Sequence, residues 1–320
     1  MRKSRVRKFV RKSSSDEGNE LLMSEMFEQF MLVKKGEGLA SRTLEEYYKN
    51  FDYFLRYTET DLTKEEMTLE KFMGWIEYML DELDYSPHTV NIRVRTMRAF
   101  VRYCYEDKNW INEPIHKRFK PIKAPIDNVD SFTIEEVKSL LATIDDTTYV
   151  GFRTKVIIYV LLDTMMRSCE LLDVKRENVD LKGLSIKLDA AETKTRTTRT
   201  VPLSPKTAKL LSEYMDETDE FESDYLFVSY EGKQLSYSCI KDNIKILGQI
   251  AGIKNKRVSP YVFRHTGALF YIMNNGDPFS LQKILGHGHM NMVRRYVQMT
   301  NVEIQHKHAN HSPVNYVFKK

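Results

Sequence analysis

The sequence is poor in cysteine, because its 320 residues include only Cys104, Cys169 and Cys239. An odd number of isolated cysteines excludes a disulfide-stapled scaffold, lacks the paired spacing of a zinc knuckle and favours a reducing compartment. The sequence also lacks any run of 18 apolar residues, which excludes an ordinary transmembrane helix. No apolar stretch of the secretory kind opens the N-terminus. We therefore expect a cytoplasmic protein.

Strong charge of one sign is also missing overall, since the net charge is only +4. The positive charge is instead concentrated in blocks. Residues 1–13 carry seven Lys or Arg and no acid, and residues 86–105 hold four arginines without an acid. Such blocks are typical of surfaces that bind a polyanion. A disordered tail and a solvated helix face remain the alternative interpretation of the same residues.

The length predicts about two domains. After a basic tail over residues 1–20, residues 21–106 have the pattern of about four helices. The fourth begins at "SPHTVN", where Ser86 caps the helix and Pro87 takes its first position. One face of this helix carries apolar residues. We expect another face, spaced by three and four residues, to bind DNA; its residues are His88, Asn91, Arg95, Arg98 and Arg102.

Residues 107–131 contain Pro114, Pro121 and Pro125 among basic residues and show no helical period, which predicts a semi-extended linker. The second domain, residues 132–320, begins with the helix start "FTIEEVKSLL". Strand-like segments such as "LSIKL" and "TRTVPLS" then lie among helices. The order predicts a mainly α fold with a small antiparallel β-sheet, of the α+β class.

Four motifs in the second domain carry residues suited to chemistry on phosphate. "TMMRSCELL" places Arg167 three residues before Glu170, and "ETKTRTTRTVPLS" places Lys194 in a predicted turn between strands. "YVFRHTGAL" contains Arg264 at a helix start. "LGHGHMNMVRRYV" contains His287 and, nine residues later, Tyr296. Alone, Arg167 and Glu170 fit a surface pair, and Tyr296 fits a buried aromatic on an amphipathic helix.

The four motifs in this order resemble the tyrosine recombinase (phage integrase) family. The resemblance covers about residues 21–320 and implies an N-terminal four-helix SAM-like core-binding domain followed by a catalytic domain. In that family a tyrosine attacks a DNA phosphodiester and forms a 3′-phosphotyrosine. The catalytic residues implied for this chain are Arg167, Lys194, Tyr261, Arg264, His287 and Tyr296.

The residue types fit this chemistry, which depends on positioning and on stabilising charge at phosphorus. Arg167 and Arg264 can each bind two phosphate oxygens and keep their charge. His287 can donate to the same oxygens, and Lys194 can protonate the departing 5′ oxygen. Tyr296 would carry the covalent bond. No cofactor and no metal are expected, because the arginines supply the charge and the clustered carboxylates of two-metal nucleases are missing.

Two positions depart from the family pattern. Met165 stands where a glycine is usual, which we expect to alter packing. Tyr261 stands where the His of His-x-x-Arg is usual, and a phenol with a pKa of about 10 is a poor general base at neutral pH. We expect Tyr261 to orient the phosphate by a hydrogen bond. We expect His265 to pack at the helix start, and the histidines clustered with His287 lack metal-ligand spacing; they are His289, His306, His308 and His311.

The sequence therefore predicts a site-specific DNA recombinase of a mobile element, an integrase or transposase. Its expected partner is a double-stranded recombination site, with a tetrameric synapse of identical chains, nucleoid association on DNA, and accessory DNA-bending or directionality factors. The resemblance implies that the tail from about residue 300 packs on a neighbouring protomer. A tail folded on its own domain, a DNA-binding protein of the same fold without cleavage, and a type IB topoisomerase-like relaxation activity are the alternatives.

Overall fold

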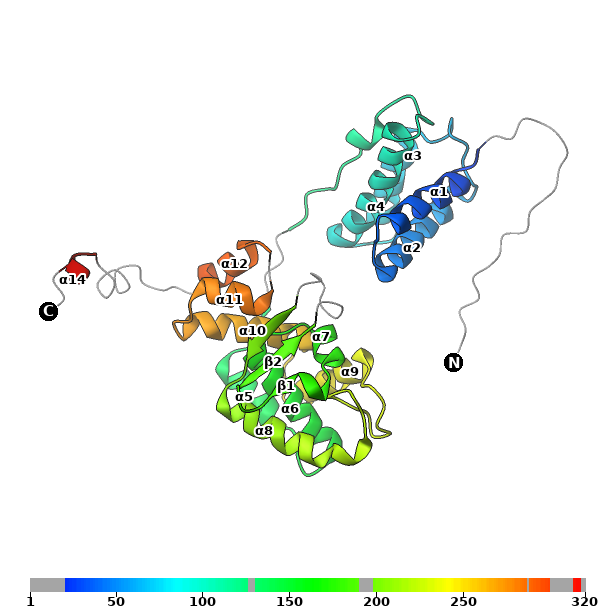
Figure 1. Cartoon of the computed structure of the whole chain (residues 1–320). Helices are drawn as coiled ribbons and strands as arrows, with labels where there is room; N and C mark the ends of the chain where they lie inside the picture. Colours follow the sequence, from blue (N-terminus) through cyan, green and yellow to red (C-terminus); the bar gives the residue numbers. More distant parts are fainter. Residues whose placement is uncertain (1–20, 126–129, 190–197, 287, 300–312, 318–320) are drawn as a thin grey trace. The chain divides into compact units, whose positions relative to one another are not determined.

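The computed structural model describes residues 21–125, 130–189, 198–286, 288–299 and 313–317. The chain forms two compact units, residues 1–127 and 128–320, which we call unit 1 and unit 2 (Figure 1). Each unit has its own hydrophobic core. No helix within the described ranges is both long and apolar enough to cross a membrane.

Unit 1 is a helical bundle built on an unusually aromatic core. Its helices are α1 (Met23–Gly36), α2 (Ser41–Thr58), α3 (Leu69–Asp81), α4 (Pro87–Glu106) and the short 3-10 helix η1 (Ile115–Lys117). Helix α4 begins as its sequence predicts, because the Ser86 hydroxyl accepts a hydrogen bond from the Thr89 amide and Pro87 follows directly. The rings of Phe27 and Phe51 stack with centroids 4.0 Å apart, which joins α1 to α2.

One arginine of the basic block on α4 belongs to this core. Arg93 is 7% exposed, and its guanidinium lies between the rings of Tyr53 and Tyr85, at 4.0 and 4.3 Å from their centroids. Two cation–π contacts hold the charge where water is excluded. The side chains of Arg95 and Arg102 remain exposed on the same helix. The positive face of α4 is therefore narrower than the spacing of its arginines suggests.

The segment predicted as a linker from residue 107 differs from that prediction over its first part. Ile111, Ile115 and Phe119 recur at spacings of four and are buried in the core of unit 1. The ring of Phe119 stacks on that of Phe72 with centroids 4.6 Å apart. Pro114 lies within this repeat and Pro121 and Pro125 follow it, so the segment does not look helical in the sequence. Unit 1 therefore extends past α4, and a linker begins only after the segment around Ile122, whose backbone is still bound to α4.

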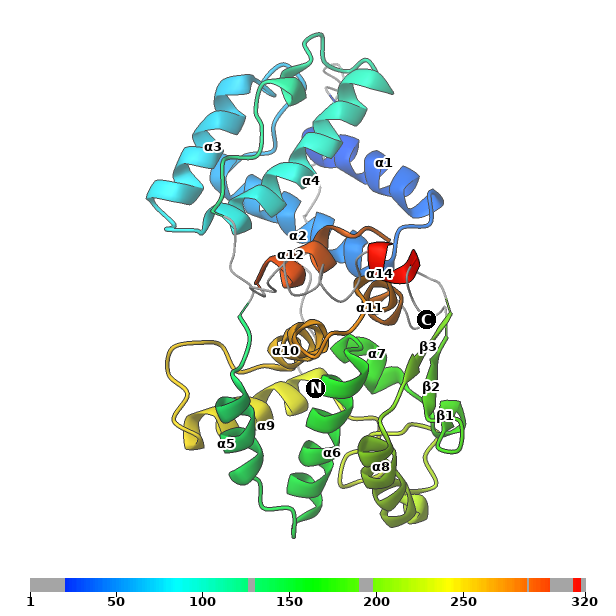
Figure 2. The same ribbon diagram turned by 90° about the vertical axis from the view of Figure 1, so that its left-hand side faces the viewer.

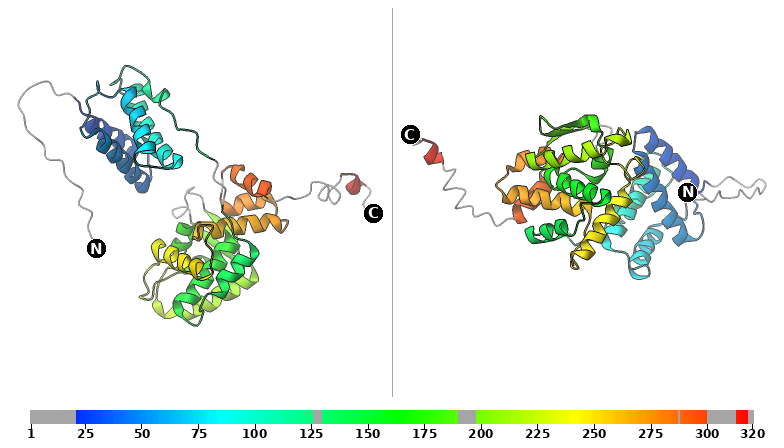
Figure 3. Two further views of the ribbon diagram at one scale, coloured as in Figure 1. Left: turned by 180° about the vertical axis from the view of Figure 1, so that it is seen from behind. Right: turned by 90° about the horizontal axis from the view of Figure 1, so that it is seen from below.

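Unit 2 is mainly helical with a small sheet at one side (Figure 2). Its helices are α5 (Ile134–Ala142), α6 (Tyr149–Thr164), α7 (Ser168–Asp173), η2 (Arg176–Asn178), α8 (Pro205–Glu217), η3 (Asp219–Phe221), α9 (Tyr237–Ile250), α10 (Pro260–Met273), α11 (Pro278–Leu285), α12 (Asn291–Met299) and α14 (Pro313–Val317). Helix α6 is the centre of this unit, packing against α8, α9, α10 and β3 (Figure 3). Its apolar sequence is explained by these neighbours on every side.

The sheet has the antiparallel order β1-β2-β3, with β1 at Val179–Asp180, β2 at Ser185–Leu188 and β3 at Arg199–Pro202. In β2 and β3 alternate residues point into the core, and Ile186 pairs with Val201 in the register. The predicted α+β class is confirmed. The segment between β2 and β3, which is predicted as a turn and carries Lys194, lies outside the described residues.

Helices α6 and α10 approach each other closely at Gly267. A Cβ at this position would lie 2.3 Å from the carbonyl oxygen of Leu162. The contact brings the start of α10, with Arg264, close to the C-terminal end of α6 and so to Arg167. Glycine is required here because any side chain would separate the two helices that carry the arginines.

We predict that Phe119→Ala lowers the free energy of unfolding of unit 1 by about 3–5 kcal/mol, the usual cost of removing a buried ring. Trp75 and Trp110 are the two tryptophans of the chain and both lie in unit 1, so tryptophan fluorescence during urea unfolding reports on this unit. Lys120→Ala, at an exposed neighbouring position, is the control. If the two variants had equal urea midpoints of unfolding, residues 107–125 would be a linker, as the sequence predicts.

Candidate active site

Arg167 is positioned by the break between α6 and α7. Helix α6 ends at Thr164, and Met165 closes it in the left-handed region with φ 52°. Arg167 then caps α7, and its backbone N–H donates to Oε2 of Glu170 at 2.8 Å. The Arg-x-x-Glu spacing is thus a capping arrangement, with Glu170 at the third helical position. A glycine at position 165 would adopt this φ without strain, which explains the residue usual there.

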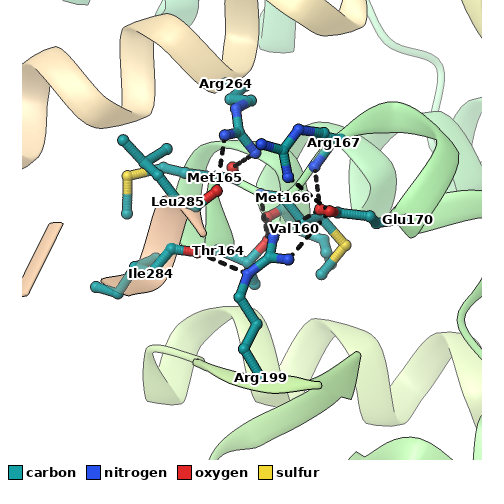
Figure 4. A network of polar contacts seen from close by, with 10 residues as sticks. All are labelled: Val160, Thr164, Met165, Met166, Arg167, Glu170, Arg199, Arg264, Ile284 and Leu285. Carbon is teal, nitrogen blue, oxygen red and sulfur yellow. Dashed lines mark hydrogen bonds and ion pairs between the residues drawn. The ribbon is translucent and has the colours of Figure 1, made fainter. Parts of the chain in front are cut away.

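Glu170 holds two arginines with one buried carboxylate (Figure 4). Its side chain is 0% exposed, and it accepts from Nη1 of Arg167 at 2.8 Å. Arg199 of β3 donates to both carboxylate oxygens, at 3.0 and 2.6 Å. Burial alone would raise the pKa of Glu170, but the hydrogen bonds from Arg199 and Arg167 outweigh it and lower the pKa below its ordinary value. The carboxylate is therefore charged at neutral pH.

Arg199 also ties the C-terminal end of α11 to this pair. Its Nε donates to the carbonyl oxygen of Ile284 at 3.1 Å. Gly286 ends α11 with φ +63°, and a Cβ there would lie 3.0 Å from the guanidinium of Arg199. The Leu-Gly-His motif needs its glycine for both reasons. Sequence reasoning gave Arg199 no role, although the Arg-x-Val-Pro-Leu strand that contains it is part of the motif.

Arg264 is the most buried of these arginines, with 5% of its surface exposed. It donates to the carbonyl oxygen of Met165 at 2.6 Å and to that of Leu285 at 3.0 Å. Both carbonyls belong to helix ends, where backbone acceptors have no helical partner. Burial, helped by repulsion from Arg167, lowers the pKa of Arg264 to about 10. The guanidinium still carries its charge at neutral pH.

Tyr296 lies on α12 and is 1% exposed, in a cluster with Met165, Leu285 and Val293. The apolar spacing that suggested a core aromatic is therefore real. Its hydroxyl, however, is hydrogen-bonded to Nδ1 of His265 on α10. Burial raises the pKa of Tyr296, and the charge of Arg264 opposes that shift. The phenol is therefore both buried and within electrostatic reach of an arginine of the site.

Tyr261 and His265 lie one turn apart on α10. Tyr261 is 57% exposed, and its ring packs edge-on against the imidazole of His265 with centroids 4.1 Å apart. The exposure of Tyr261 excludes a core role. His265 was expected only to pack, and it is 3% exposed; its bond to Tyr296 is a contact that sequence reasoning missed. The spacing between residues 265 and 296 carries no pattern that would reveal it.

Two predicted catalytic residues, Lys194 and His287, lie outside the described residues, as do His306, His308 and His311. The segments that lead to two of them are described. Arg199 begins β3 shortly after Lys194, and Gly286 precedes His287. Arg199 is bonded to Glu170 of the Arg167–Glu170 pair, and Gly286 lies against the guanidinium of Arg199. Arg167, Arg264 and Tyr296 are brought together, and Tyr261 lies at the edge of the same helix start.

The predicted DNA face of α4 is only partly free. Arg95 and Arg102 are exposed, whereas Nε of Arg98 donates to the carbonyl oxygen of His116 at 2.9 Å. His88 is exposed, and its Nε2 contacts the carbonyl oxygen of Pro125 at 3.0 Å. These two residues therefore also hold the segment that follows α4.

Asn91 corrects the sequence-based assignment. It is 4% exposed, and both ends of its amide are bonded to the backbone of Ile122, at 2.9 and 2.8 Å. Because the Asn91 side chain is buried and is already bonded to the backbone at both its nitrogen and its oxygen, it does not reach a base edge. We assign Asn91 to fixing the segment after α4. Polar residues at helical spacing look alike in a sequence whether they face DNA or a neighbouring segment.

The family model described as the phage integrase family matches residues 130–303, which include every element of the site. The chain belongs to the phage integrase family. The predicted identity as a tyrosine-type site-specific recombinase is thereby confirmed at the level of family. Tyrosine recombinase XerD of Listeria innocua is 25% identical over 297 residues, spanning 90% of this chain and 97% of its own length. XerC of Staphylococcus epidermidis is 23% identical over 301 residues, spanning 91% and 98%.

Solved structures share the fold. The Tn1549 transposon integrase in complex with transposon right end DNA is 16% identical, with a TM-score of 0.74 over 89% of this chain and 97% of that one. A lambda integrase dimer bound to a COC′ core site is 14% identical, with a TM-score of 0.71 over 85% and 97%.

We predict that Glu170→Gln destabilises unit 2 by about 3–5 kcal/mol, because two partly buried arginines lose the buried carboxylate that they share. Since the folded-state pKa of Glu170 lies below its ordinary value of 4.5, its contribution is complete above that value and is lost as the pH falls through the folded-state pKa. The difference between wild type and variant should therefore shrink in acid. Urea unfolding followed by circular dichroism at several pH values measures it.

Exposed Glu177→Gln, in the same unit, is the control for the loss of one carboxylate. Tryptophan fluorescence should not change, because both tryptophans lie in unit 1. A Glu170→Gln variant as stable as Glu177→Gln at neutral pH would contradict the role given to Glu170.

Proposed function

We propose that the chain is a site-specific DNA recombinase that cleaves and rejoins strands through a 3′-phosphotyrosine on Tyr296. The observation that carries the proposal is the convergence of Arg167 and Arg264 beside a buried phenol. Arg167 is held by Glu170, and Arg264 is held by the carbonyl oxygens of Met165 and Leu285. Such fixed cations suit charge that develops on a phosphate during transfer.

The proposed cleavage conserves the energy of the DNA bond. Oxygen of Tyr296 attacks phosphorus, and the 5′ oxygen leaves with a proton that we assign to Lys194 as general acid. Arg167, Arg264 and His287 would stabilise the non-bridging oxygens. A 5′-hydroxyl from another strand then reverses the step and releases Tyr296, so strand exchange needs no nucleotide cofactor.

We propose that DNA contacts unit 1 through the exposed arginines of α4, Arg95 and Arg102, with Arg98 and His88 at the margin of this surface. Arg102 is paired only loosely with Glu106, at 4.0 Å, and its side chain is 58% exposed. Such a pair is easily exchanged for a phosphate. The seven cations of residues 1–13 would add a salt-dependent contribution through counterion release.

We propose that four chains assemble on DNA by exchange of the tail from about residue 300. Helix α14 in this tail exposes the apolar residues Val314 and Val317, at 61% and 72%. Two exposed valines on one short helix suit a contact with another protomer. Head-to-tail exchange of this kind closes into a ring.

We propose that the recombinase serves a mobile element, as integrase or transposase. The fold shared with the Tn1549 transposon integrase and with lambda integrase supports this assignment, and XerD and XerC are relatives as well. DNA-bending or directionality factors would then assist it. Inverted repeats and an attachment site in the flanking DNA would support the mobile-element assignment, and their absence would count against it.

The second candidate is a DNA-binding protein of the same fold without cleavage. The observation in its favour is that Tyr296 is 1% exposed. A nicked suicide substrate separates the two, since only an active recombinase traps a covalent complex. Relaxation of any supercoiled DNA, without a defined site, would instead indicate a topoisomerase-like activity.

We predict that Tyr296→Phe abolishes covalent attachment to a nicked site while DNA binding persists, because only the nucleophilic oxygen is removed. Gel electrophoresis in denaturant detects the adduct, and a mobility shift measures binding. Tyr214→Phe, which removes the hydroxyl of another buried tyrosine of unit 2, is the control and should cleave normally. An adduct formed by Tyr296→Phe would assign the nucleophile to a different residue.

We predict that Tyr261→His retains cleavage, whereas Tyr261→Phe loses about 1–3 kcal/mol of transition-state stabilisation, the value of one hydrogen bond, or roughly ten- to a hundredfold in rate. Single-turnover cleavage of a nicked site measures both rates. The 57% exposure of Tyr261 means that neither variant should change the melting temperature appreciably. A Phe variant that cleaves at the wild-type rate would remove Tyr261 from the site.

A further inference from the structure

The hydrogen bond between Tyr296 and His265 joins a nucleophile to a group that can accept its proton. Nδ1 of His265 contacts the hydroxyl oxygen of Tyr296 directly, and both side chains are buried. An imidazole within hydrogen-bond reach of an attacking hydroxyl is the usual arrangement of a nucleophile and its base. No other role already assigned in the site uses this imidazole.

The phenol of Tyr296 needs such a partner. A phenol with an ordinary pKa of about 10 is protonated at neutral pH, and burial raises the pKa of Tyr296 further. Attack on phosphorus must therefore release a proton from this oxygen. Arg264 cannot take it, because it is itself protonated.

Helix geometry places His265 where it can replace a missing group. Residue 261, where His is usual in the family, is Tyr, and its phenol is a poor base. His265 follows four residues later, so both side chains lie on one face of α10, and their rings are in contact. The imidazole is present in this chain, one helical turn farther along, and it faces Tyr296.

We propose that His265 is a catalytic residue that accepts the proton of Tyr296 during cleavage and returns it during rejoining. This proposal rests on the proposed function. As the bond from Tyr296 oxygen to phosphorus forms, the proton moves to Nδ1 of His265, the bond from phosphorus to the 5′ oxygen breaks, and that oxygen takes a proton from the general acid. In rejoining, the 5′-hydroxyl attacks phosphorus and gives its proton back to the general acid, the phosphotyrosine bond breaks, and His265 returns its proton to Tyr296.

The charges around His265 make this transfer dependent on DNA. Arg264 precedes His265 in α10, and Arg167 is close enough for its positive charge to lower the pKa of Arg264. These cations oppose a positive imidazole when the site is empty. A bound phosphate brings negative charge to the same place and offsets them. Since Tyr296 is 1% exposed, DNA binding must also uncover its oxygen while the contact with His265 is kept.

The test combines His265→Asn with a tyrosine of altered acidity. Asn can accept a hydrogen bond near the position of Nδ1 but cannot take the proton. We expect His265→Asn to cleave a nicked site about 10²–10⁴ times more slowly than wild type. Trifluorotyrosine at position 296 ionises more readily, so it should restore most of the lost rate in His265→Asn while changing the wild-type rate little. His289→Asn, at an exposed histidine, is the control.

A second substrate distinguishes the loss of a general base from the loss of the general acid. A 5′-bridging phosphorothiolate has a leaving group that needs no proton, so it should not rescue His265→Asn but should rescue a variant that lacks the general acid, Lys194→Ala. Rescue of His265→Asn by the phosphorothiolate would overturn the proposal. So would His265→Asn cleaving as fast as, or faster than, wild type, because His265 would then only hold Tyr296 at rest.

A slow His265→Asn variant that trifluorotyrosine fails to rescue would likewise overturn the base role and leave a structural one. The proposed function is tested separately by the wild-type chain. If wild type forms no covalent adduct on any nicked site, the proposed function fails and the proposal fails with it. If wild type forms the adduct and His265→Asn is unimpaired, only the role of His265 fails.

Discussion

The buried carboxylate of Glu170 is the interaction on which the rest of the site depends. Two arginines that approach one another repel, and in a dry interior that repulsion is strong. Glu170 offsets it with both oxygens, binding Arg167 from its own helix start and Arg199 from β3. Arg199 in turn holds the end of α11 through Ile284. One acidic residue thus joins three segments that lie far apart in the sequence.

Arg264 extends the same arrangement by a different means. It donates to the carbonyl oxygens of Met165 and Leu285. These backbone acceptors lie at helix ends, where they have no partner within the helix, and they fix Arg264 without a second carboxylate. Arg264 keeps its charge at neutral pH, and its charge adds to that of Arg167. The resulting excess of positive charge near the phenol of Tyr296 is what an incoming phosphate would neutralise, and it favours binding of DNA over binding of neutral ligands.

The motifs predicted the fold class and brought out Arg167, Arg264 and Tyr296, because a capping pair, a helix start and a fixed spacing are local features that a sequence displays. They did not reveal Arg199 or His265, whose roles arise from contacts across 29 and 31 residues. They misplaced Asn91, since helical spacing shows that polar residues share a face but not what covers that face. The same limit applies to the burial of Arg93 between two tyrosines and of Phe119 in a segment that contains prolines. Met165 was expected to affect packing, and its backbone at φ 52° shows that conformation matters there as well.

Mass spectrometry of the trapped DNA adduct tests the central claim most directly, because it identifies the oxygen that attacks. After cleavage of a nicked site, digestion with trypsin separates the peptide 296–307, which follows Arg295, from the peptide 258–264, which contains the exposed Tyr261. We predict a nucleotide joined through phosphate to Tyr296 in the first peptide and an unmodified second peptide. A nucleotide on Tyr261, or an adduct on any residue other than Tyr296, would contradict it.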